Sequence, residues 1–314
     1  MLSSWQNVKY ATLMTSIDLV WEHTMTTIME GDILTYLHDS VAPVTWQLQI
    51  PERGFSSAKR FIARSLHRTV FVKLGGDHRR LQILSDAKLA PQLLAGGAFG
   101  DTCITVQEFI EGQHPTRQWY AANGATWVNL MHTLFQLSEL RDTLPHYADE
   151  TYRSLLARYI DQVTAIYSPS NVSQHEQSVV ETLLADYPAR LRFIQGAGLV
   201  PVHGDPSADN LLITPTHVYL VDWDTLHLSD PMRDVALVLW WMYPPTHWPE
   251  LLDRFQINLN DGAQQERLYL YISVWALEVA LFFANTQQKE WKQRFLRDAR
   301  DAYARQQPEQ PLIV

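Results

Sequence analysis

Cysteine is nearly absent from this sequence, and so are the marks of secretion or membrane insertion. The single cysteine in 314 residues, Cys103, excludes an intramolecular disulfide and a cysteine-rich zinc site. No apolar run has the length that we would expect of a membrane span. The first residues lack a basic stretch followed by an apolar core, so we expect no signal peptide. These absences favour a cytoplasmic protein without a membrane partner.

Positive charge is scarce as well. The 25 lysines and arginines are outnumbered by 34 aspartates and glutamates, which leaves a net charge of -9. A chain this acidic is not typical of a general nucleic-acid binder, because the phosphate backbone attracts basic surfaces. The same charge is compatible with a cationic substrate. At 46% hydrophobic and 19% charged residues, the composition is that of a globular protein, and the length accommodates two lobes or domains.

The chain does contain a dense polar motif, which reads V-H-G-D-P-S-A-D-N-L-L-I-T-P-T-H-V-Y-L-V-D-W-D over residues 202–224. An Asp followed five positions later by an Asn, just before an apolar run, suits a loop that faces a phosphate. Asp205 can accept a proton from an attacking hydroxyl. Asn210 and Asp222 offer a neutral and a charged oxygen to a hard cation such as Mg²⁺.

The apolar segments inside this motif predict a β-hairpin. Residues 211–213 and 218–221 are joined by a Thr-Pro-Thr turn at 214–216, which is the usual signature of two short paired strands. Such a hairpin would return Asp222 to the side of Asn210. The two candidate metal ligands would then lie close together.

The polar residues of the motif form an ordered set that continues beyond it. They are His203-Gly204-Asp205, Asn210, Asp222-Trp223-Asp224, Asp230-Pro231 and Asp234. This set resembles the aminoglycoside phosphotransferase and choline kinase superfamily, which is similar to the protein kinases in fold and phosphoryl-transfer machinery. The resemblance implies that Asp205 is the catalytic base, that Asn210 and Asp222 hold Mg²⁺, and that ATP or GTP is the phosphoryl donor. The alternative is an ordinary hairpin with acidic turns.

The resemblance also implies positioning roles for neighbouring residues. His203 is expected to hydrogen-bond the backbone and shape the loop rather than to act as a base. Asp234 opens an apolar helix and is expected to tie that helix to the catalytic loop. Asp224 either adds a second metal contact or orders its own loop.

Ahead of the motif, the apolar period changes to two and predicts three antiparallel strands. They cover residues 46–50, 61–64 and 69–74. A Gly/Ser loop between the first two contains Ser56 and Ser57, and its backbone N–H groups can approach phosphate oxygens. The resemblance makes Lys73, in the third strand, the lysine that holds the α- and β-phosphates of the nucleotide. The alternative is an edge-strand lysine that faces water.

The acid that should orient Lys73 is missing from the next helix. Protein kinases place a Glu there, whereas residues 77–84 contain none and Asp77 stands where the Glu would be expected. Because Asp is one methylene shorter, the pair would be looser or absent. A nucleotide-binding pseudokinase or scaffold therefore stays open as an alternative of another class.

A second apolar, β-branched strand region, residues 102–109, leads to the sequence Glu108-Phe109-Ile110-Glu111-Gly112. The resemblance makes this segment the hinge between two lobes. The backbone at Glu108 and Ile110 is then expected to hydrogen-bond the base of the nucleotide. Because backbone groups rather than side chains would recognise the base, the choice between ATP and GTP stays open.

After Gly112 the apolar residues recur at helical spacing. Together these patterns predict an α+β, two-lobed, protein-kinase-like fold. The expected parts are an N-terminal helical extension over 1–30, a small antiparallel β-rich, nucleotide-binding N-lobe over 31–110, and a large mainly helical C-lobe over 111–314. The C-lobe is expected to hold the catalytic loop and the acceptor site.

Two C-lobe residues are candidates for contact with the acceptor. Glu278 is a carboxylate within an apolar helix, which is costly unless it is paired or hydrated. It either meets a substrate ammonium or pairs with an arginine of the same lobe. Trp241 belongs to a group of late tryptophans that either pack the core or form an aromatic wall for a cation.

The sequence therefore predicts a small-molecule kinase that transfers the γ-phosphoryl of ATP or GTP to a hydroxyl of an aminoglycoside-like or other small cationic substrate. A choline- or ethanolamine-type metabolite kinase is the alternative within the same chemistry. The partners expected are the nucleotide, Mg²⁺ and the acceptor, with no nucleic acid and no membrane.

Overall fold

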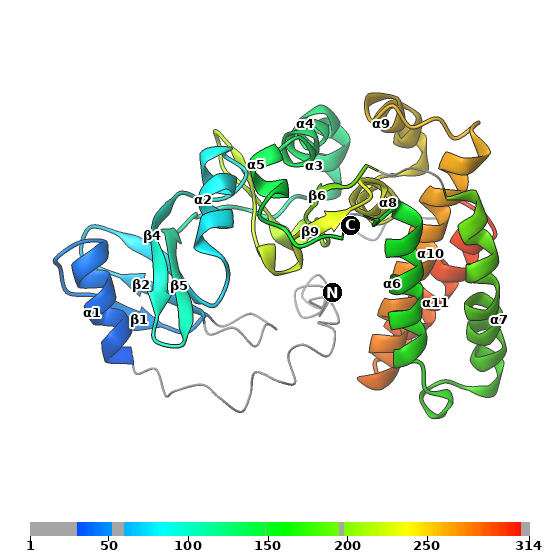
Figure 1. The fold of residues 1–314 in the computed structure, drawn as a ribbon, viewed down its shortest axis with the longest axis horizontal. Coiled ribbons are helices and arrows are strands. Elements are labelled where there is room, and N and C mark those ends of the chain that lie inside the picture. Colours follow the sequence, from blue (N-terminus) through cyan, green and yellow to red (C-terminus); the bar gives the residue numbers. More distant parts are fainter. Residues whose placement is uncertain (1–29, 52–59, 148, 195–197, 309–314) are drawn as a thin grey trace. The chain divides into compact units, whose positions relative to one another are not determined.

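The computed structural model describes residues 30–51, 60–147, 149–194 and 198–308, and the chain divides into two compact units (Figure 1). The first unit runs to His114 and also takes up Asp209–Asp224. The second comprises Pro115–Ala208 and the chain from Thr225 onward. The helix predicted within residues 1–30 lies outside the described residues, as do Ser56 and Ser57.

A five-stranded antiparallel sheet in the order β1-β2-β3-β5-β4 forms the body of the first unit. Its strands are β1 (Gln47–Gln49), β2 (Arg60–Arg64), β3 (Thr69–Leu74), β4 (Leu93–Phe99) and β5 (Thr102–Glu108). The three antiparallel strands predicted ahead of the motif are confirmed as β1 to β3. In β3, Val70, Val72 and Leu74 are buried on one face, so the period-two alternation places Lys73 on the other face.

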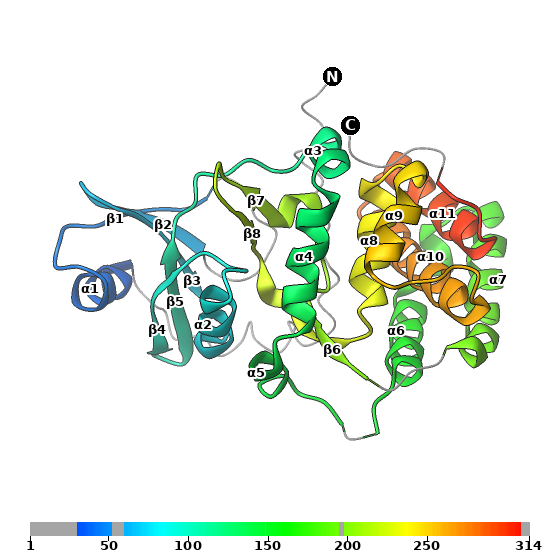
Figure 2. The ribbon, with the colours of Figure 1, turned by 90° about the horizontal axis from the view of Figure 1, so that it is seen from above.

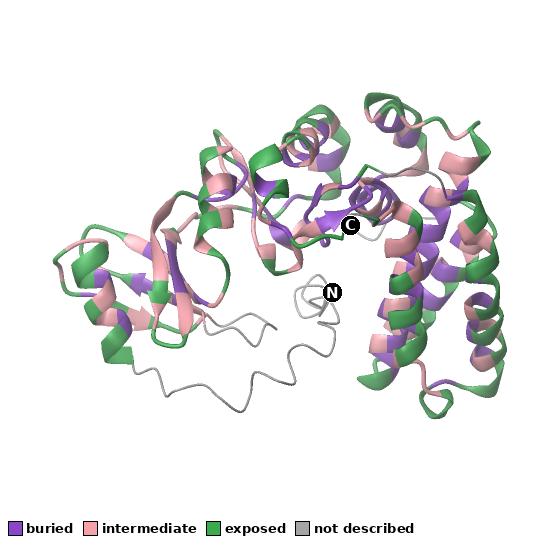
Figure 3. Cartoon of the chain, viewed as in Figure 1, coloured by how far each residue is buried: buried purple, intermediate pink, exposed green. Residues whose placement is uncertain are grey.

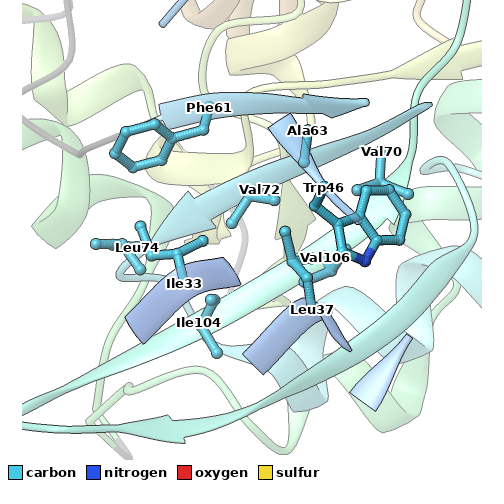
Figure 4. Close-up of a cluster of buried hydrophobic side chains, with 10 residues drawn as sticks. All are labelled: Ile33, Leu37, Trp46, Phe61, Ala63, Val70, Val72, Leu74, Ile104 and Val106. Atoms are coloured by element: carbon cyan, nitrogen blue, oxygen red, sulfur yellow. The ribbon is translucent and has the colours of Figure 1, made fainter. Parts of the chain in front are cut away.

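The core of this unit lies between the sheet and helix α1 (Glu30–Ser40). Figure 4 shows Ile33 and Leu37 of α1 among side chains from the strands. The whole cluster consists of Ile33, Leu37, Trp46, Phe61, Ala63, Val70, Val72, Leu74, Ile104 and Val106. Because this core covers one face of β3, the position of Lys73 is fixed on the opposite face.

The predicted hairpin is confirmed as β7 (Leu211–Ile213) and β8 (Val218–Leu220), with Leu211 opposite Leu220. Three attachments hold it to the first unit. Leu220 N–H donates to Leu89 O at 2.7 Å, His217 Nε2 lies 2.6 Å from Lys88 O, and Ile213 bridges to Gln113. The first two anchors follow helix α2 (His78–Asp86). Figure 2 shows β7 and β8 side by side.

The second unit is mainly helical, and it also contains the two-stranded sheet β6 (Val200–Val202) with β9 (His227–Ser229). Its α-helices are α3 (Arg117–Ala122), α4 (Gly124–Phe135), α5 (Ser138–Arg141), α6 (Tyr152–Ile166), α7 (Gln174–Arg190), α8 (Met232–Met242), α9 (Trp248–Arg254), α10 (Gly262–Asn285) and α11 (Lys289–Tyr303). Short 3₁₀ turns occur at Pro169–Asn171, Leu191–Phe193, Ala208–Asn210, Trp223–Thr225 and Pro245–His247, of which Ala208–Asn210 and Trp223–Thr225 span the junctions between the units.

Helix α10 is the central element of the helical core (Figure 3). Over its 24 residues it is long and apolar enough to cross a membrane by length and composition, so the expectation that no apolar run reaches that length is wrong. In the most apolar window of this helix, however, 78% of the residues are buried inside the structure. Its hydrophobic character is accounted for by packing against α8 and α11.

Candidate active site

The loop that carries Asp205 is held in place by the first turn of α8. The Asp234 carboxylate, which is fully buried, accepts the backbone N–H groups of His203 at 2.7 Å and of Gly204 at 3.0 Å. Burial raises the pKa of Asp234 to about 6, against the opposing effect of these two hydrogen bonds. The expectation that Asp234 ties its helix to the catalytic loop is therefore confirmed.

His203 shapes the loop rather than facing a substrate. Its Nδ1 accepts the Asp205 N–H at 3.3 Å, and its carbonyl accepts the Thr225 hydroxyl at 2.7 Å. The imidazole is fully buried. This confirms the positioning role expected for His203. Asp205, an acid of the same loop, is 8% exposed.

Gly204 is required at its position for two independent reasons. Its φ of +85° is a left-handed conformation that side chains rarely adopt. In addition, a Cβ there would lie 2.6 Å from the Thr225 backbone oxygen, which is closer than real Cβ contacts. The tight turn between His203 and Asp205 therefore depends on the absence of a side chain.

We expect Gly204→Ala to lower the free energy of unfolding by roughly 2 to 5 kcal/mol, because left-handed strain and a backbone clash add together. Gly75→Ala is the matched control, since Gly75 has a φ of +86° but open space where its Cβ would be. It should cost only about 1 to 2 kcal/mol of strain. Chemical denaturation of both variants checks this, and equal losses would show that the contact with Thr225 is unimportant.

The metal-ligand candidates belong to the first unit. Val221 N–H donates to Asn210 O at 2.9 Å, so the residue next to Asp222 is paired with Asn210, as the hairpin predicts. Asp222 itself has a φ of +64°. Left-handed backbone is uncommon outside glycine and is enriched at functional sites, so this outlier marks Asp222 as constrained.

Lys73 pairs with the acids that follow the hairpin. Its ammonium forms an ion pair with Asp224 and lies 3.9 Å from Asp222 Oδ1. Arg60 reaches the same acids, with Nη2 3.0 Å from Asp222 Oδ1 and 3.3 Å from Asp224 Oδ2. Burial alone would raise the pKa of Asp224, but Lys73 and Arg60 outweigh it and hold the pKa below its ordinary value.

Asp77 does not stand in for the missing helix Glu. It is the N-cap of α2, where its carboxylate accepts the backbone N–H groups of Arg79 at 2.9 Å and Arg80 at 3.3 Å. Its second oxygen lies 3.3 Å from the Arg80 guanidinium. The acids found beside Lys73 are Asp222 and Asp224 instead.

Substitutions at Asp77 test this reassignment. Asp77→Asn should leave both stability and kcat nearly unchanged, because Asn caps a helix as well as Asp does. Asp77→Ala should lower the free energy of unfolding by about 1 kcal/mol while sparing kcat. Thermal melts and steady-state rates on the two variants check it. A large loss of kcat in Asp77→Asn would restore Asp77 as the partner of Lys73.

At the end of β5, in the segment expected to be the hinge, one backbone N–H already donates a hydrogen bond within the sheet unit. Glu108 N–H donates to Gln92 O at 2.9 Å, so this N–H is not available to a ligand. Among the described residues, Ile110 N–H has no backbone acceptor. The contacts expected of this segment with a nucleotide base would therefore fall to the Glu108 carbonyl and the Ile110 N–H.

The two acceptor candidates lie in the helical unit. Trp241 is 2% exposed, donates from Nε1 to Asp298 at 3.1 Å and packs on Trp275. A contact with substrate would require this core to open, so Trp241 serves packing here. The Glu278 carboxylate accepts the Tyr159 hydroxyl. Burial raises the pKa of Glu278, although the Tyr159 hydrogen bond and nearby Arg233 lower it.

Comparison with known proteins decides the family. A sequence model of the phosphotransferase enzyme family matches residues 37–270, which is well over half of the chain. The chain belongs to the phosphotransferase enzyme family. It is accordingly an enzyme that transfers a phosphoryl group to an alcohol, and the suspected superfamily is confirmed.

Solved structures place this phosphotransferase in the same fold. A spectinomycin phosphotransferase, in complex with ADP and spectinomycin, is 16% identical with a TM-score of 0.60, covering 88% of this chain and 99% of that one. An aminoglycoside phosphotransferase, a thermostable mutant in its apo form, is 13% identical with a TM-score of 0.65, covering 88% and 98%. A choline kinase from Streptococcus pneumoniae is 15% identical with a TM-score of 0.62, covering 88% and 99%. The two-lobed, kinase-like fold is thereby confirmed.

The donor set of the phosphotransferase fits Mg²⁺ bound together with phosphate. Within the described ranges, no group of three or more His, Cys, Asp or Glu side chains could hold a metal ion by itself. Asn210 and Asp222 offer oxygens, and Mg²⁺ in kinase sites takes one or two carboxylates and completes its shell with phosphate oxygens and water. The residues present therefore fit that ion.

Arg60 is the site residue of the phosphotransferase that the sequence pattern did not reveal. Residues 65–68 form the turn between β2 and β3, and the resulting register pairs Arg60 with Lys73. A strand predicted from Phe61 onward stops one residue short of it. Extending the pairing back from the turn would have placed a second cation beside Lys73.

Proposed function

We propose that this small-molecule kinase transfers the γ-phosphoryl group of ATP or GTP to a hydroxyl of an aminoglycoside-like or other small cationic acceptor. The observation that carries the proposal is the arrangement of one short stretch, in which the candidate base and the candidate metal ligands occupy neighbouring segments. Asp205 lies on a loop fixed by Asp234. Asn210 and Asp222 flank the hairpin that follows, and Asp222 lies near Lys73.

In the proposed mechanism the acceptor hydroxyl attacks the γ-phosphorus, and the bond from that phosphorus to the β–γ bridging oxygen breaks. Asp205 accepts the hydroxyl proton, and the nucleoside diphosphate leaves with the electron pair. Lys73 compensates negative charge on the phosphates. Asn210 and Asp222 would hold Mg²⁺, which when bound would supply further positive charge at the phosphate oxygens. Positioning and fixed charge account for the acceleration.

The donor site is proposed from the first unit. The Glu108 carbonyl and the Ile110 N–H would pair with the base, and the loop with Ser56 and Ser57 would approach the phosphates. The solved structure of the spectinomycin phosphotransferase contains ADP, which supports a nucleotide donor for this relative. We propose that the enzyme lies in the cytoplasm with its nucleotide donor.

The cationic acceptor is supported by charge and by the relatives. The chain carries a net charge of -9, and one neighbour is named for spectinomycin and another for choline. Glu278 is the proposed contact for a substrate ammonium, which would replace the hydroxyl of Tyr159 on its carboxylate. The likeness to a choline kinase favours choline or ethanolamine as the second candidate.

A phosphorylation screen tests the proposal. Aminoglycosides, choline, ethanolamine and neutral sugars are incubated with Mg-ATP or Mg-GTP, and products are detected by mass spectrometry. A phosphomonoester of an amino-sugar compound is the expected result, whereas phosphocholine or phosphoethanolamine would establish the second candidate. Nucleotide binding without any product would contradict both and favour a scaffold.

A further inference from the structure

Arg60 and Lys73 face the same two carboxylates from neighbouring strands of one unit. We call Arg60, Lys73, Asp222 and Asp224 the charge quartet. Arg60 lies opposite Lys73 in the β2–β3 register, and their side chains are 13% and 15% exposed. Two positive and two negative charges thus cancel within a partly buried group.

Arg60 holds an oxygen that a divalent cation would use. Its Nη2 lies 3.0 Å from Asp222 Oδ1, in a half-buried setting, and it shares the same nitrogen with Asp224 Oδ2 at 3.3 Å. A cation at Asp222 Oδ1 would have to displace this contact or share the oxygen with it. In the absence of nucleotide, the guanidinium therefore competes with a metal ion.

The rest of the Arg60 guanidinium is suited to an anion. Both carboxylate contacts come from Nη2, and Nε is buried without a hydrogen-bond partner among the described residues. A guanidinium presents five donors in a planar fork, which matches two phosphate oxygens at once. Once the side chain leaves the carboxylates, this Nε edge would give the guanidinium a second donor for a phosphate, beside the lysine expected there.

We propose that Arg60 is an exchangeable cation of the nucleotide site. It neutralises Asp222 and Asp224 when no nucleotide is present, and it transfers to phosphate oxygens when a divalent cation takes the carboxylates. This rests on the proposed function, in which nucleotide and metal meet at these residues. The exchange keeps each charge compensated, and it makes metal and nucleotide bind cooperatively because each ligand removes the competitor of the other.

Arg60→Met distinguishes this role from a structural one, because it is expected to raise the affinity for a metal ion and to lower the affinity for a nucleotide. Binding of Mn²⁺ alone, followed by electron paramagnetic resonance, should become roughly tenfold tighter because the competitor of the metal is gone. Binding of the nonhydrolysable nucleotide AMP-PNP in EDTA, followed by calorimetry, should become roughly tenfold weaker. Both measurements use the full chain.

Arg64→Met is the matched control. Arg64 lies on the same strand and face, four residue pairs away, and its side chain is exposed, so both affinities should stay within about twofold of the wild type. Arg60→Lys keeps the positive charge but removes the planar guanidinium and its paired N–H donors. It should leave Mn²⁺ affinity near the wild type and weaken AMP-PNP less than Arg60→Met does, and it serves as the test if the methionine variant does not fold.

The proposal is supported only if Arg60→Met tightens Mn²⁺ binding and weakens AMP-PNP binding. If Arg60→Met weakens both ligands, or changes neither, Arg60 only supports the fold and the proposal is overturned. Neither measurement needs an acceptor or turnover. The two binding measurements can therefore be interpreted even if the acceptor screen yields no product. If the Arg60 proposal fails, the proposed role of Asp205 in phosphoryl transfer is not affected.

Discussion

Asp205→Asn is expected to lower kcat by a factor of about 10² to 10⁴, which is the usual contribution of a positioned general base. The side chain keeps its shape but can no longer take the hydroxyl proton. Because the donor residues lie on other segments, the Kd for AMP-PNP should change by less than about threefold. Single-turnover rates with a substrate found in the screen, together with calorimetry, measure both quantities.

Asp209→Asn is the matched control for this experiment, since it makes the same chemical change four residues further along. Asp209 lies in the 3₁₀ turn before the hairpin and is partly exposed. We expect a rate within about twofold of the wild type, because the Asp209 side chain is partly exposed and has no assigned part in proton transfer or metal binding. A normal rate in Asp205→Asn would remove Asp205 from the mechanism, whatever the control shows.

Asp222→Asn is expected to lower kcat/KM by about 10² to 10³, in line with the loss of one group that compensates charge on the reacting phosphate. Asn is suitable here because it tolerates left-handed backbone almost as Asp does. The φ of +64° is therefore retained, and the substitution changes charge without releasing strain. The rate should also need a higher Mg²⁺ concentration to saturate.

A titration of rate against Mg²⁺ and Mn²⁺ checks the assignment of Asp222 to the metal. The melting temperature is measured alongside, because Asp222 also pairs with Arg60 and Lys73 and the loss of this pairing would change stability rather than the metal dependence. Partial recovery at high Mn²⁺ would support the role. An unchanged metal dependence would show that Asp222 only pairs with Arg60 and Lys73.

The small lobe was predictable because its signals are local. Alternation in 69–74 and the turn at 65–68 fix one hairpin, and the Thr-Pro-Thr turn fixes the other, so β2, β3, β7 and β8 follow from neighbours in sequence. The order His203, Asp205, Asn210 and Asp222 is also local. Chemistry that depends on such spacing can be found without a structure.

The differences from the prediction have separate causes. Asp77 stands where the helix Glu is expected, but an Asp before a new helix is also an N-cap signal, and the structure shows the cap. Trp241 belongs to α8, which is apolar around nearly its whole circumference, so no stripe indicates which side faces the core. Arg60 depends on the pairing of β2 with β3 and on the return of Asp222, which only the folded chain brings together.

The assignment of Asp209–Asp224 to the N-terminal unit has a consequence for dividing this protein. A cut after His114 would separate the sheet from the hairpin that pairs through Gln113 and Leu89, and it would leave Lys73 without Asp224. Neither gene half would then encode a complete folding unit. Because the chain enters each unit twice, the two units cannot be exchanged as separate modules by a single crossover.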